Sequence, residues 1–346
     1  MVYPPARLNA WIIASILCAP LASAQLTFDF IGDYVAPSRE TIPSRAIYRR
    51  GSNIILDVRW APAADDTNAL MVETLGPAVL RAANGVLEIP PFSLDPSTVP
   101  ASKGRVLHKQ VVFGPLPNVI THGRLTLPVR ITVGGDVLQS RVETNLYTVE
   151  SRPLIAPVLE GTDFLDEASR YAEGSAGESA ARAITIGLNA SGRLRYDDAR
   201  PIDLIDYSKG TIHLEALKAA TPLPVNCYQA SGYLAYLLAA LGIESSAREI
   251  VLQPGPRGPY YFETKPAAEV GTDLYKVLRM YSHQFLLVQG RVYDVTYSAL
   301  NSLDGKPSKQ AIAGWTLEEY LKGGFVASES KFNFGYGDAP LFARPQ

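Results

Sequence analysis

Three residues in the C-terminal half of the chain could together carry out nucleophilic catalysis: Cys227, His283 and Asp294, which occur in that order. A thiolate is a strong nucleophile, an imidazole can take up and return its proton, and a carboxylate can orient the imidazole. A cysteine followed by a histidine and an aspartate is therefore the pattern expected of an acyl-transfer enzyme that works through a thioester.

Each of these residues also has an ordinary structural interpretation. Taken singly, Cys227 is more often a buried helix residue, His283 a polar residue at a strand end and Asp294 a charge near a turn. Three separate coincidences together favour the catalytic interpretation. They are the order of the three residues, the position of the cysteine at a helix start, and the strand face that the histidine and the aspartate share.

The second cysteine, Cys18, lies in a segment with the features of a secretory signal. Residues 1–24 contain Arg7, an apolar run over residues 10–17 and the small-residue site Ala22-Ser23-Ala24. We expect cleavage after Ala24 and a secreted or periplasmic protein; lipid attachment at Cys18 is less favoured because Leu17 is not small. The exported chain would then carry one thiol, Cys227, and no intramolecular disulfide.

The composition excludes several classes of partner. The 346 residues carry 32 basic and 34 acidic side chains in mixed order and a net charge of −2, so we expect no binding to nucleic acid or to an anionic membrane. No further apolar stretch approaches transmembrane length. The four histidines have no metal-site spacing with one another or with Cys227, so neither a metal nor a cofactor is predicted. A protein or peptide substrate is the expected partner.

The sequence predicts that Cys227 begins a helix. Four leucines recur at helical spacing, Asn226 is a suitable N-cap and Gly242 a suitable C-cap, which gives a helix over residues 227–241; the leucines are Leu234, Leu237, Leu238 and Leu241. Unpaired N–H groups and the helix dipole in the first turn would favour the thiolate and an oxyanion. Asn226 and Gln229 are the candidate side-chain donors to that oxyanion.

His283 and Asp294 fall on a predicted two-stranded hairpin. Residues 283–288 and 291–295 are strand-like and flank the turn Gln289-Gly290. If Val288 pairs with Arg291, His283 and Asp294 become diagonal neighbours on one face, within reach of a side-chain hydrogen bond. A slip of one residue would place them on opposite faces.

The remaining elements suggest two domains and an α+β chain overall. Short alternating strands fill residues 25–152, most clearly 125–133 and 137–149 around Gly134-Gly135, which predicts an antiparallel, immunoglobulin-like β-sandwich. Prolines end this pattern, and helical periodicity begins after Thr162 or Asp163. We expect further helices over 178–188 and 213–220 in a second domain of residues 153–346.

Three stretches of the second domain resemble the transglutaminase-like superfamily: residues 193–197, 226–243 and the hairpin residues 282–283 with 293–296. This resemblance implies a papain-like core with Cys227 as nucleophile, His283 as base and Asp294 as its partner, often preceded by a β-sandwich. Family members commonly have a tryptophan where Phe285 stands and a glycine where Asn226 stands. Candidate substrate-cleft residues are Tyr196, Tyr260, Tyr261 and Phe285.

Two functions are consistent with these features. The first is an exported cysteine enzyme that attacks a peptide bond or a glutamine side chain, more in keeping with a hydrolase (protease or amidase) than with a cross-linking transglutaminase. The second is a non-catalytic binding protein that keeps a transglutaminase-like scaffold.

Overall fold

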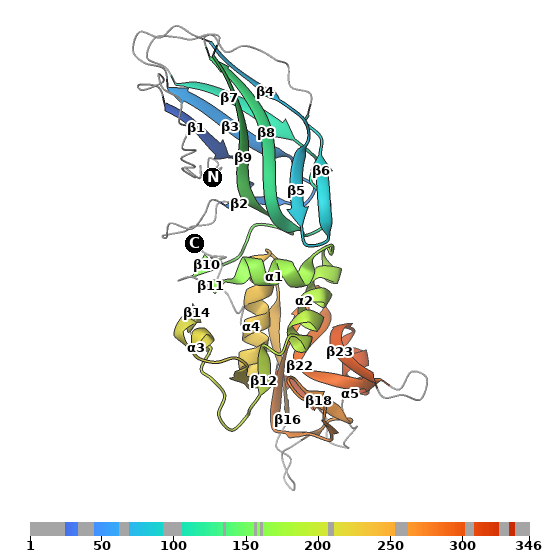
Figure 1. The fold of residues 1–346 in the computed structure, drawn as a ribbon. Helices are drawn as coiled ribbons and strands as arrows, with labels where there is room; N and C mark the ends of the chain where they lie inside the picture. The colour runs from blue at the N-terminus through green and yellow to red at the C-terminus, as the bar shows by residue number, and fades with distance from the viewer. Residues whose placement is uncertain are drawn as a thin grey trace. The chain divides into compact units, whose positions relative to one another are not determined.

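The computed structural model describes most of the chain outside its two ends. The described residues are 25–33, 45–61, 69–92, 106–133, 136–155, 158–159, 162–206, 211–252, 262–301, 308–324 and 332–335. The chain divides into two compact units, residues 1–152 and residues 153–346. Strands predominate and helices are few, as Figure 1 shows.

The first unit is a β-sandwich. One sheet has the order β1-β3-β7, and the other has the order β2-β9-β8-β5-β6 with β4 also paired to β8. The strands are β1 (Gln25–Phe30), β2 (Arg45–Arg49), β3 (Ile54–Ala61), β4 (Leu70–Thr74), β5 (Ala78–Ala82), β6 (Gly85–Ile89), β7 (Leu107–Phe113), β8 (His122–Val133) and β9 (Asp136–Val149).

The apolar residues of both sheets meet in one core. Alternate residues of β8 and of β3, from opposite sheets, point inward and are buried together. These inward residues are Leu125, Leu127, Val129, Ile131, Ile54, Leu56 and Val58. A period of two along each strand places every second side chain on the same face, which is why the alternating sequence folds into this sandwich.

The sequence predicted the β8–β9 hairpin correctly, but one strand pair differs from a purely antiparallel sandwich. Residues 122–133 of β8 pair antiparallel with β9, while the predicted turn residues Gly134 and Gly135 lie outside the described residues. β2 instead pairs in parallel with β9, with Arg45 opposite Asn145. Because β2 and β9 are far apart in sequence, no hairpin forces them to be antiparallel.

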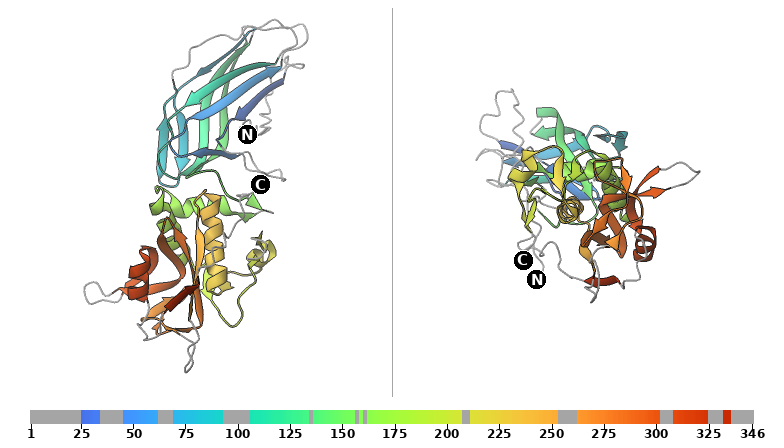
Figure 2. Two further views of the ribbon diagram at one scale, coloured as in Figure 1. Left: turned by 180° about the vertical axis from the view of Figure 1, so that it is seen from behind. Right: turned by 90° about the horizontal axis from the view of Figure 1, so that it is seen from below.

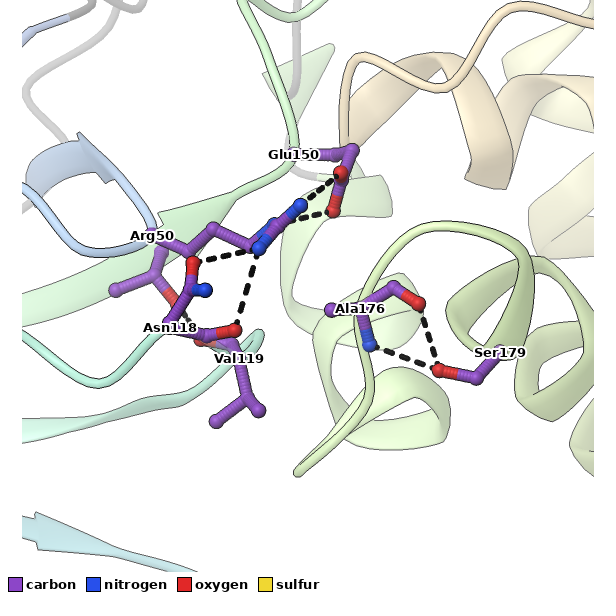
Figure 3. Close-up of polar contacts among 7 residues, drawn as sticks. Arg50, Asn118, Val119, Glu150, Ala176 and Ser179 are labelled. Atoms are coloured by element: carbon purple, nitrogen blue, oxygen red, sulfur yellow. Dashed lines mark hydrogen bonds and ion pairs between the residues drawn. The ribbon is translucent and has the colours of Figure 1, made fainter.

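The pair β2 and β9 is also joined by side chains where the strands end. The Arg50 guanidinium donates two hydrogen bonds of 2.7 Å to the Glu150 carboxylate and one of 2.5 Å to Asn118 Oδ1 (Figure 3). Both members of the ion pair are about one-quarter exposed or less. The bidentate contact fixes the last turn of the sandwich before the second unit begins.

The second unit combines a seven-stranded antiparallel sheet with five helices among the described residues. The sheet order is β19-β18-β22-β21-β16-β24, with β23 also paired to β22. Its strands are β16 (Ser246–Leu252), β18 (Ala267–Glu269), β19 (Tyr275–Lys276), β21 (Ser282–Val288), β22 (Arg291–Asn301), β23 (Ser308–Trp315) and β24 (Phe332–Gly335). The helices are α1 (Phe164–Ala172), α2 (Glu178–Ala190), α3 (Leu214–Ala219), α4 (Cys227–Ala240) and α5 (Leu317–Gly324).

Helix α4 is the central helix of this unit. It is buried on nearly every side and contacts β21 and β22 of the sheet and the helices α1 and α2. In Figure 2 it is the long gold helix beside the strands of the sheet. A helix that is apolar all round is stable only inside a protein. The site described below lies where the first turn of α4 meets the sheet.

Short elements complete the second unit. They are β10 (Val158–Leu159) with β11 (Thr162–Asp163), β12 (Leu194–Tyr196) with β15 (Leu223–Val225), β13 (Ile205–Asp206) with β14 (Thr211–Ile212), and β17 (Phe262–Glu263) with β20 (Arg279–Met280). Asp163 caps α1 as the sequence suggested, and Ser179 exchanges hydrogen bonds with the backbone of Ala176 at the start of α2 (Figure 3). Within the part of the chain described, no helix is long and apolar enough to cross a membrane.

Candidate active site

Cys227 is the first residue of α4, and Asn226 is its N-cap, both as the sequence predicted. The Asn226 side-chain oxygen accepts a hydrogen bond of 3.1 Å from the backbone N–H of Gln229. The preceding strand β15 runs parallel to β12, which brings Val225 opposite Tyr196. The Cys227 side chain thus enters the first helical turn, where backbone N–H groups and the helix dipole favour negative charge.

Two hydrogen bonds hold the first turns of α4 against the strand that carries His283. The Ser231 hydroxyl donates to the carbonyl oxygen of Gln284 at 3.0 Å, and the hydroxyls of Tyr228 and Ser282 are 3.2 Å apart. Tyr228 also donates to the Glu249 carboxylate. Because Ser282 and Gln284 flank His283, these contacts place the helix start and the histidine next to each other.

His283 and Asp294 meet in the hairpin register that the sequence predicted. Val288 pairs with Arg291, and the turn residues Gln289 and Gly290 have φ of 50° and 78°, as a tight turn of this kind requires. His283 Nε2 lies 2.7 Å from Asp294 Oδ2, and both side chains are fully buried. This geometry is that of a charge-assisted hydrogen bond.

The Asp294 carboxylate accepts two more hydrogen bonds. The backbone N–H of Thr296 donates to Oδ1 at 2.9 Å, and the Tyr320 hydroxyl donates to Oδ2 at 2.8 Å. A buried carboxylate has lost its contacts with water and needs hydrogen-bond donors in their place. Three donors therefore fix this carboxylate in one orientation.

The environment of His283 favours its charged form. Burial acts to lower its pKa, but the Asp294 carboxylate outweighs burial, the Cys227 side chain adds to the effect, and the pKa rises to about 10. Within the described residues Nδ1 makes no well-aligned hydrogen bond. Since Nε2 is bonded to Asp294, Nδ1 is the ring nitrogen that remains open to another partner.

A β-bulge brings the aromatic side chain of Tyr297 to the histidine. Along β22 and β23, Asp294 pairs with Ile312 but Ser298 pairs with Ala311, so β22 has three additional residues between them. In a regular strand residues 294 and 297 would face opposite sides. The bulge instead lets Tyr297 pack on the His283 ring, with ring centroids 4.8 Å apart.

Tyr196 continues this aromatic cluster. Its ring centroid lies 5.6 Å from that of Tyr297, and the backbone N–H of Tyr196 donates to the carbonyl oxygen of Val270 at 2.9 Å. Burial raises the pKa of both tyrosines, so both hydroxyls remain protonated. Tyr196 is half-buried beside the site, and its place in a substrate cleft stays a prediction.

The side chains of two other candidates, Phe285 and Gln229, have different surroundings from those expected. Phe285 is 2% exposed and packs on Tyr320, with ring centroids 4.9 Å apart, so it belongs to the core instead of a cleft wall. It lies two residues beyond His283 on the same strand face, where α5 covers it. The Gln229 side-chain oxygen accepts hydrogen bonds from the N–H groups of Leu204 and Ile205, so this side chain holds that segment.

The remaining candidates, Tyr260 and Tyr261, lie outside the described residues. Two side chains around the site, Tyr297 and Tyr320, were not identified from the sequence. The bulge that turns Tyr297 has no signal in the hydrophobic pattern, and Tyr320 lies on another element, 26 residues beyond Asp294. Among the residues that the structure describes, no group of three or more potential metal ligands gathers.

Comparisons with known proteins add little to this geometry. No family model matches the chain, and no curated protein matches it by sequence. Red sea bream transglutaminase is similar over 80% of this chain and 52% of its own, at 12% identity and a TM-score of 0.41. A family 123 glycoside hydrolase from Clostridium perfringens covers 32% of this chain and 23% of its own, at 5% identity and a TM-score of 0.22.

A pilin subunit from enterotoxigenic Escherichia coli covers 36% of this chain and 95% of its own, at 12% identity and a TM-score of 0.20. The chain thus spans about a quarter of the glycoside hydrolase and about half of the transglutaminase. All three TM-scores are below 0.5, and function is therefore argued from the geometry of this chain itself.

Proposed function

We propose that this chain is a cysteine-dependent acyl-transfer enzyme that acts on an amide through a thioester. The observation that carries the proposal is the fully buried His283–Asp294 pair, with 2.7 Å between Nε2 and Oδ2, whose other imidazole nitrogen is left for Cys227. Cys227 is the nucleophile, His283 the acid and base, and Asp294 the group that orients His283. The surrounding unit would be a papain-like, transglutaminase-like domain behind an immunoglobulin-like sandwich.

The reaction begins from a thiolate and an imidazolium. The Cys227 sulfur attacks the amide carbonyl carbon, and the oxyanion is stabilised by N–H groups of the first turn of α4 and by the Asn226 side-chain amide. The imidazolium gives its Nδ1 proton to the leaving nitrogen, the C–N bond breaks, and an amine departs. A thioester remains on Cys227, and His283 is neutral.

The second half of the reaction releases the acyl group. Neutral His283 takes a proton from the incoming water at Nδ1, the resulting hydroxide oxygen attacks the thioester, and the C–S bond breaks to give a carboxylic acid and the thiolate. An incoming amine would give a new amide in the same way. We propose water as the acceptor, a peptide or protein as the substrate, and export through a signal segment at residues 1–24.

The first test is alkylation of the thiol, which needs no knowledge of the substrate. We expect iodoacetamide to label Cys227 rapidly well below pH 8, and His283→Ala to slow this labelling, because the imidazolium no longer stabilises the thiolate. Labelling is measured between pH 4 and 9 by mass spectrometry of the Cys227 peptide. The matched control is His108→Ala in the sandwich.

The alternative, a non-catalytic binding protein, is favoured by one observation: the Cys227 residue is only 5% exposed. A scaffold thiol would be labelled slowly, and His283→Ala would not change its rate. That outcome would favour the non-catalytic binding protein over the enzyme.

Turnover on amide substrates provides the second test. We expect Cys227→Ser and Cys227→Ala to abolish hydrolysis and to leave the far-ultraviolet circular dichroism spectrum unchanged. Hydrolysis by purified Cys227→Ala protein would disprove the mechanism.

A further inference from the structure

The Tyr320 hydroxyl is the one side-chain donor, other than His283 itself, that reaches the Asp294 carboxylate among the described residues. It lies 2.8 Å from Oδ2, the same oxygen that His283 Nε2 reaches at 2.7 Å. Two donors therefore share one carboxylate oxygen inside a site without solvent exposure. This arrangement links a residue of α5 to the proton affinity of the histidine.

Tyr320 is held in place by apolar packing. Its side chain is about 1% exposed, and its ring lies against Phe285, which follows His283 by two residues on β21. Burial, together with the nearby carboxylate of Asp294, raises the pKa of Tyr320 well above its usual range. The phenol therefore keeps its proton and acts as a donor at any pH at which the protein would function.

Helix α5, which carries Tyr320, is anchored at both ends. A capping box closes its start: Glu319 accepts from the backbone N–H of Thr316 at 2.7 Å, and the Thr316 hydroxyl accepts from the N–H of Glu319 at 3.1 Å. At its end, the backbone N–H of Lys265 donates to the carbonyl oxygen of Gly324 at 2.8 Å. An eight-residue helix fixed in this way can hold one hydroxyl against a buried carboxylate.

We propose that Tyr320 is a positioning residue of the site: its hydroxyl holds the Asp294 carboxylate toward His283 and offsets part of the negative charge that the imidazole experiences. This inference rests on the proposed function. The positive end of the Tyr320 O–H dipole faces Oδ2. The hydroxyl therefore weakens the electrostatic attraction between Asp294 and the imidazolium. His283 then gives up its proton to the leaving amine more readily than it would beside an unshared carboxylate.

Other groups around His283 bear on its titration. They are Cys227 on α4, Asp294 and Tyr297 on β22, and Tyr196 on β12, which reaches the histidine through Tyr297. On β16 the residue paired with His283 is Ile250, which carries no charge. Replacement of Tyr320 by phenylalanine removes only the hydroxyl and leaves these groups and the ring packing in place.

The test measures the rate of iodoacetamide labelling at Cys227 in the full chain between pH 4 and 11. We expect two steps in the wild type, one where the thiolate–imidazolium pair forms and one where the imidazolium loses its proton. In Tyr320→Phe the alkaline step should move to higher pH by about half a unit to one unit. In the Asp294→Asn background the same substitution should cause no further shift, because Tyr320 acts through the carboxylate.

The matched control is Tyr233→Phe, since Tyr233 is a buried tyrosine of α4 whose hydroxyl donates to the Glu167 carboxylate at 2.6 Å. It should leave both steps unchanged. Thr316→Ala, which removes the capping box, is a second variant and should move the alkaline step in the same direction by less. These variants separate a charge effect from a loss of stability, which would not move the pH profile.

Two unfavourable outcomes are distinguishable. If the wild type shows no step that depends on His283, the proposed function is wrong and this inference with it. If the wild type shows both steps but the Tyr320→Phe profile superimposes on it, the proposed function stands and Tyr320 has no positioning role.

Discussion

Among the residues that the structure describes, each unit contains one histidine–aspartate pair, and the two pairs differ in distance and in burial. In the sandwich, His108 Nδ1 lies 3.4 Å from Asp57 Oδ2, the His108 side chain is 45% exposed, and Arg59 also contacts Asp57 at 2.8 Å. In the second unit the His283–Asp294 distance is 2.7 Å and both side chains are fully buried. The first pair is open to solvent on the His108 side and shares its buried aspartate with Arg59, while the second is a closed hydrogen-bonded site.

This difference makes the buried pair, and not the pair in the sandwich, the candidate for catalysis. A solvent-exposed ion pair contributes about 0–1 kcal/mol to stability, and a buried one often costs as much desolvation energy as its attraction returns. Stability alone therefore gives little reason to bury His283 and Asp294. Their arrangement is understandable if the pair moves protons for Cys227.

The largest expected effect separates the two aspartates. Asp294→Asn should lower amide hydrolysis by about 10³-fold, because an asparagine holds the imidazole in the wrong tautomer and no longer stabilises the imidazolium. Asp57→Asn should leave the rate per folded molecule unchanged. The measurement is kcat/KM on an amide substrate identified by screening, with folding checked by circular dichroism.

An equal loss of kcat/KM in Asp294→Asn and Asp57→Asn would contradict this prediction. A loss in Asp57→Asn would assign the sandwich pair a part in the reaction. A full rate in Asp294→Asn would leave the buried pair without a catalytic role.

A core substitution in the sandwich sharpens the same comparison through stability. Leu127 is fully buried on β8, so Leu127→Ala should lower the free energy of unfolding of the sandwich by about 3 kcal/mol. The labelling rate of Cys227 should stay the same below the unfolding transition, since the site draws all its side chains from the second unit. Urea denaturation measures the stability, and iodoacetamide labelling of the same sample measures the reactivity of Cys227. A labelling rate that differs from that of the wild type would contradict the prediction.

The sequence predicted the elements that place Cys227, His283 and Asp294, because local rules determine them. The N-cap Asn226, the turn Gln289-Gly290 and the period of two along each strand are all set by neighbouring residues. The pairing of Val288 with Arg291 then follows from the turn.

What the sequence could not predict depends on long-range packing. The three-residue bulge before Ser298 turns Tyr297 to the His283 face, and α5 brings Tyr320 to Asp294 from outside the hairpin. Phe285 was taken for a cleft residue because the pattern does not show that α5 covers its strand face. The parallel pairing of β2 with β9 was missed for the same reason, since no turn connects these strands.

The pH dependence of stability should be smaller and should again separate the two histidines. The pKa of His283 is raised from 6.5 to about 10, so the fold favours the imidazolium. Its contribution to the free energy of unfolding is complete below pH 6.5 and is lost as the pH rises through about 10. We expect the free energy of unfolding of the wild type, measured by urea denaturation, to fall between pH 6.5 and 10.

His283→Gln should remove this dependence, and His108→Gln should retain it. Parallel slopes for the wild type and His283→Gln would mean that the buried imidazole carries no extra proton in the folded protein.

The smallest expected effect concerns the ion pair that closes the sandwich. Arg50 binds Glu150 through two hydrogen bonds (Figure 3). The two side chains are 24% and 20% exposed, so water screens their attraction only in part. Arg50→Gln should lower the free energy of unfolding by about 1 kcal/mol, and 0.5 M NaCl should reduce the difference between variant and wild type. A salt-independent loss would assign the effect to the packing of the arginine stem. The His283–Asp294 pair, which is shielded from ions, should show no such salt dependence in the labelling profile of Cys227.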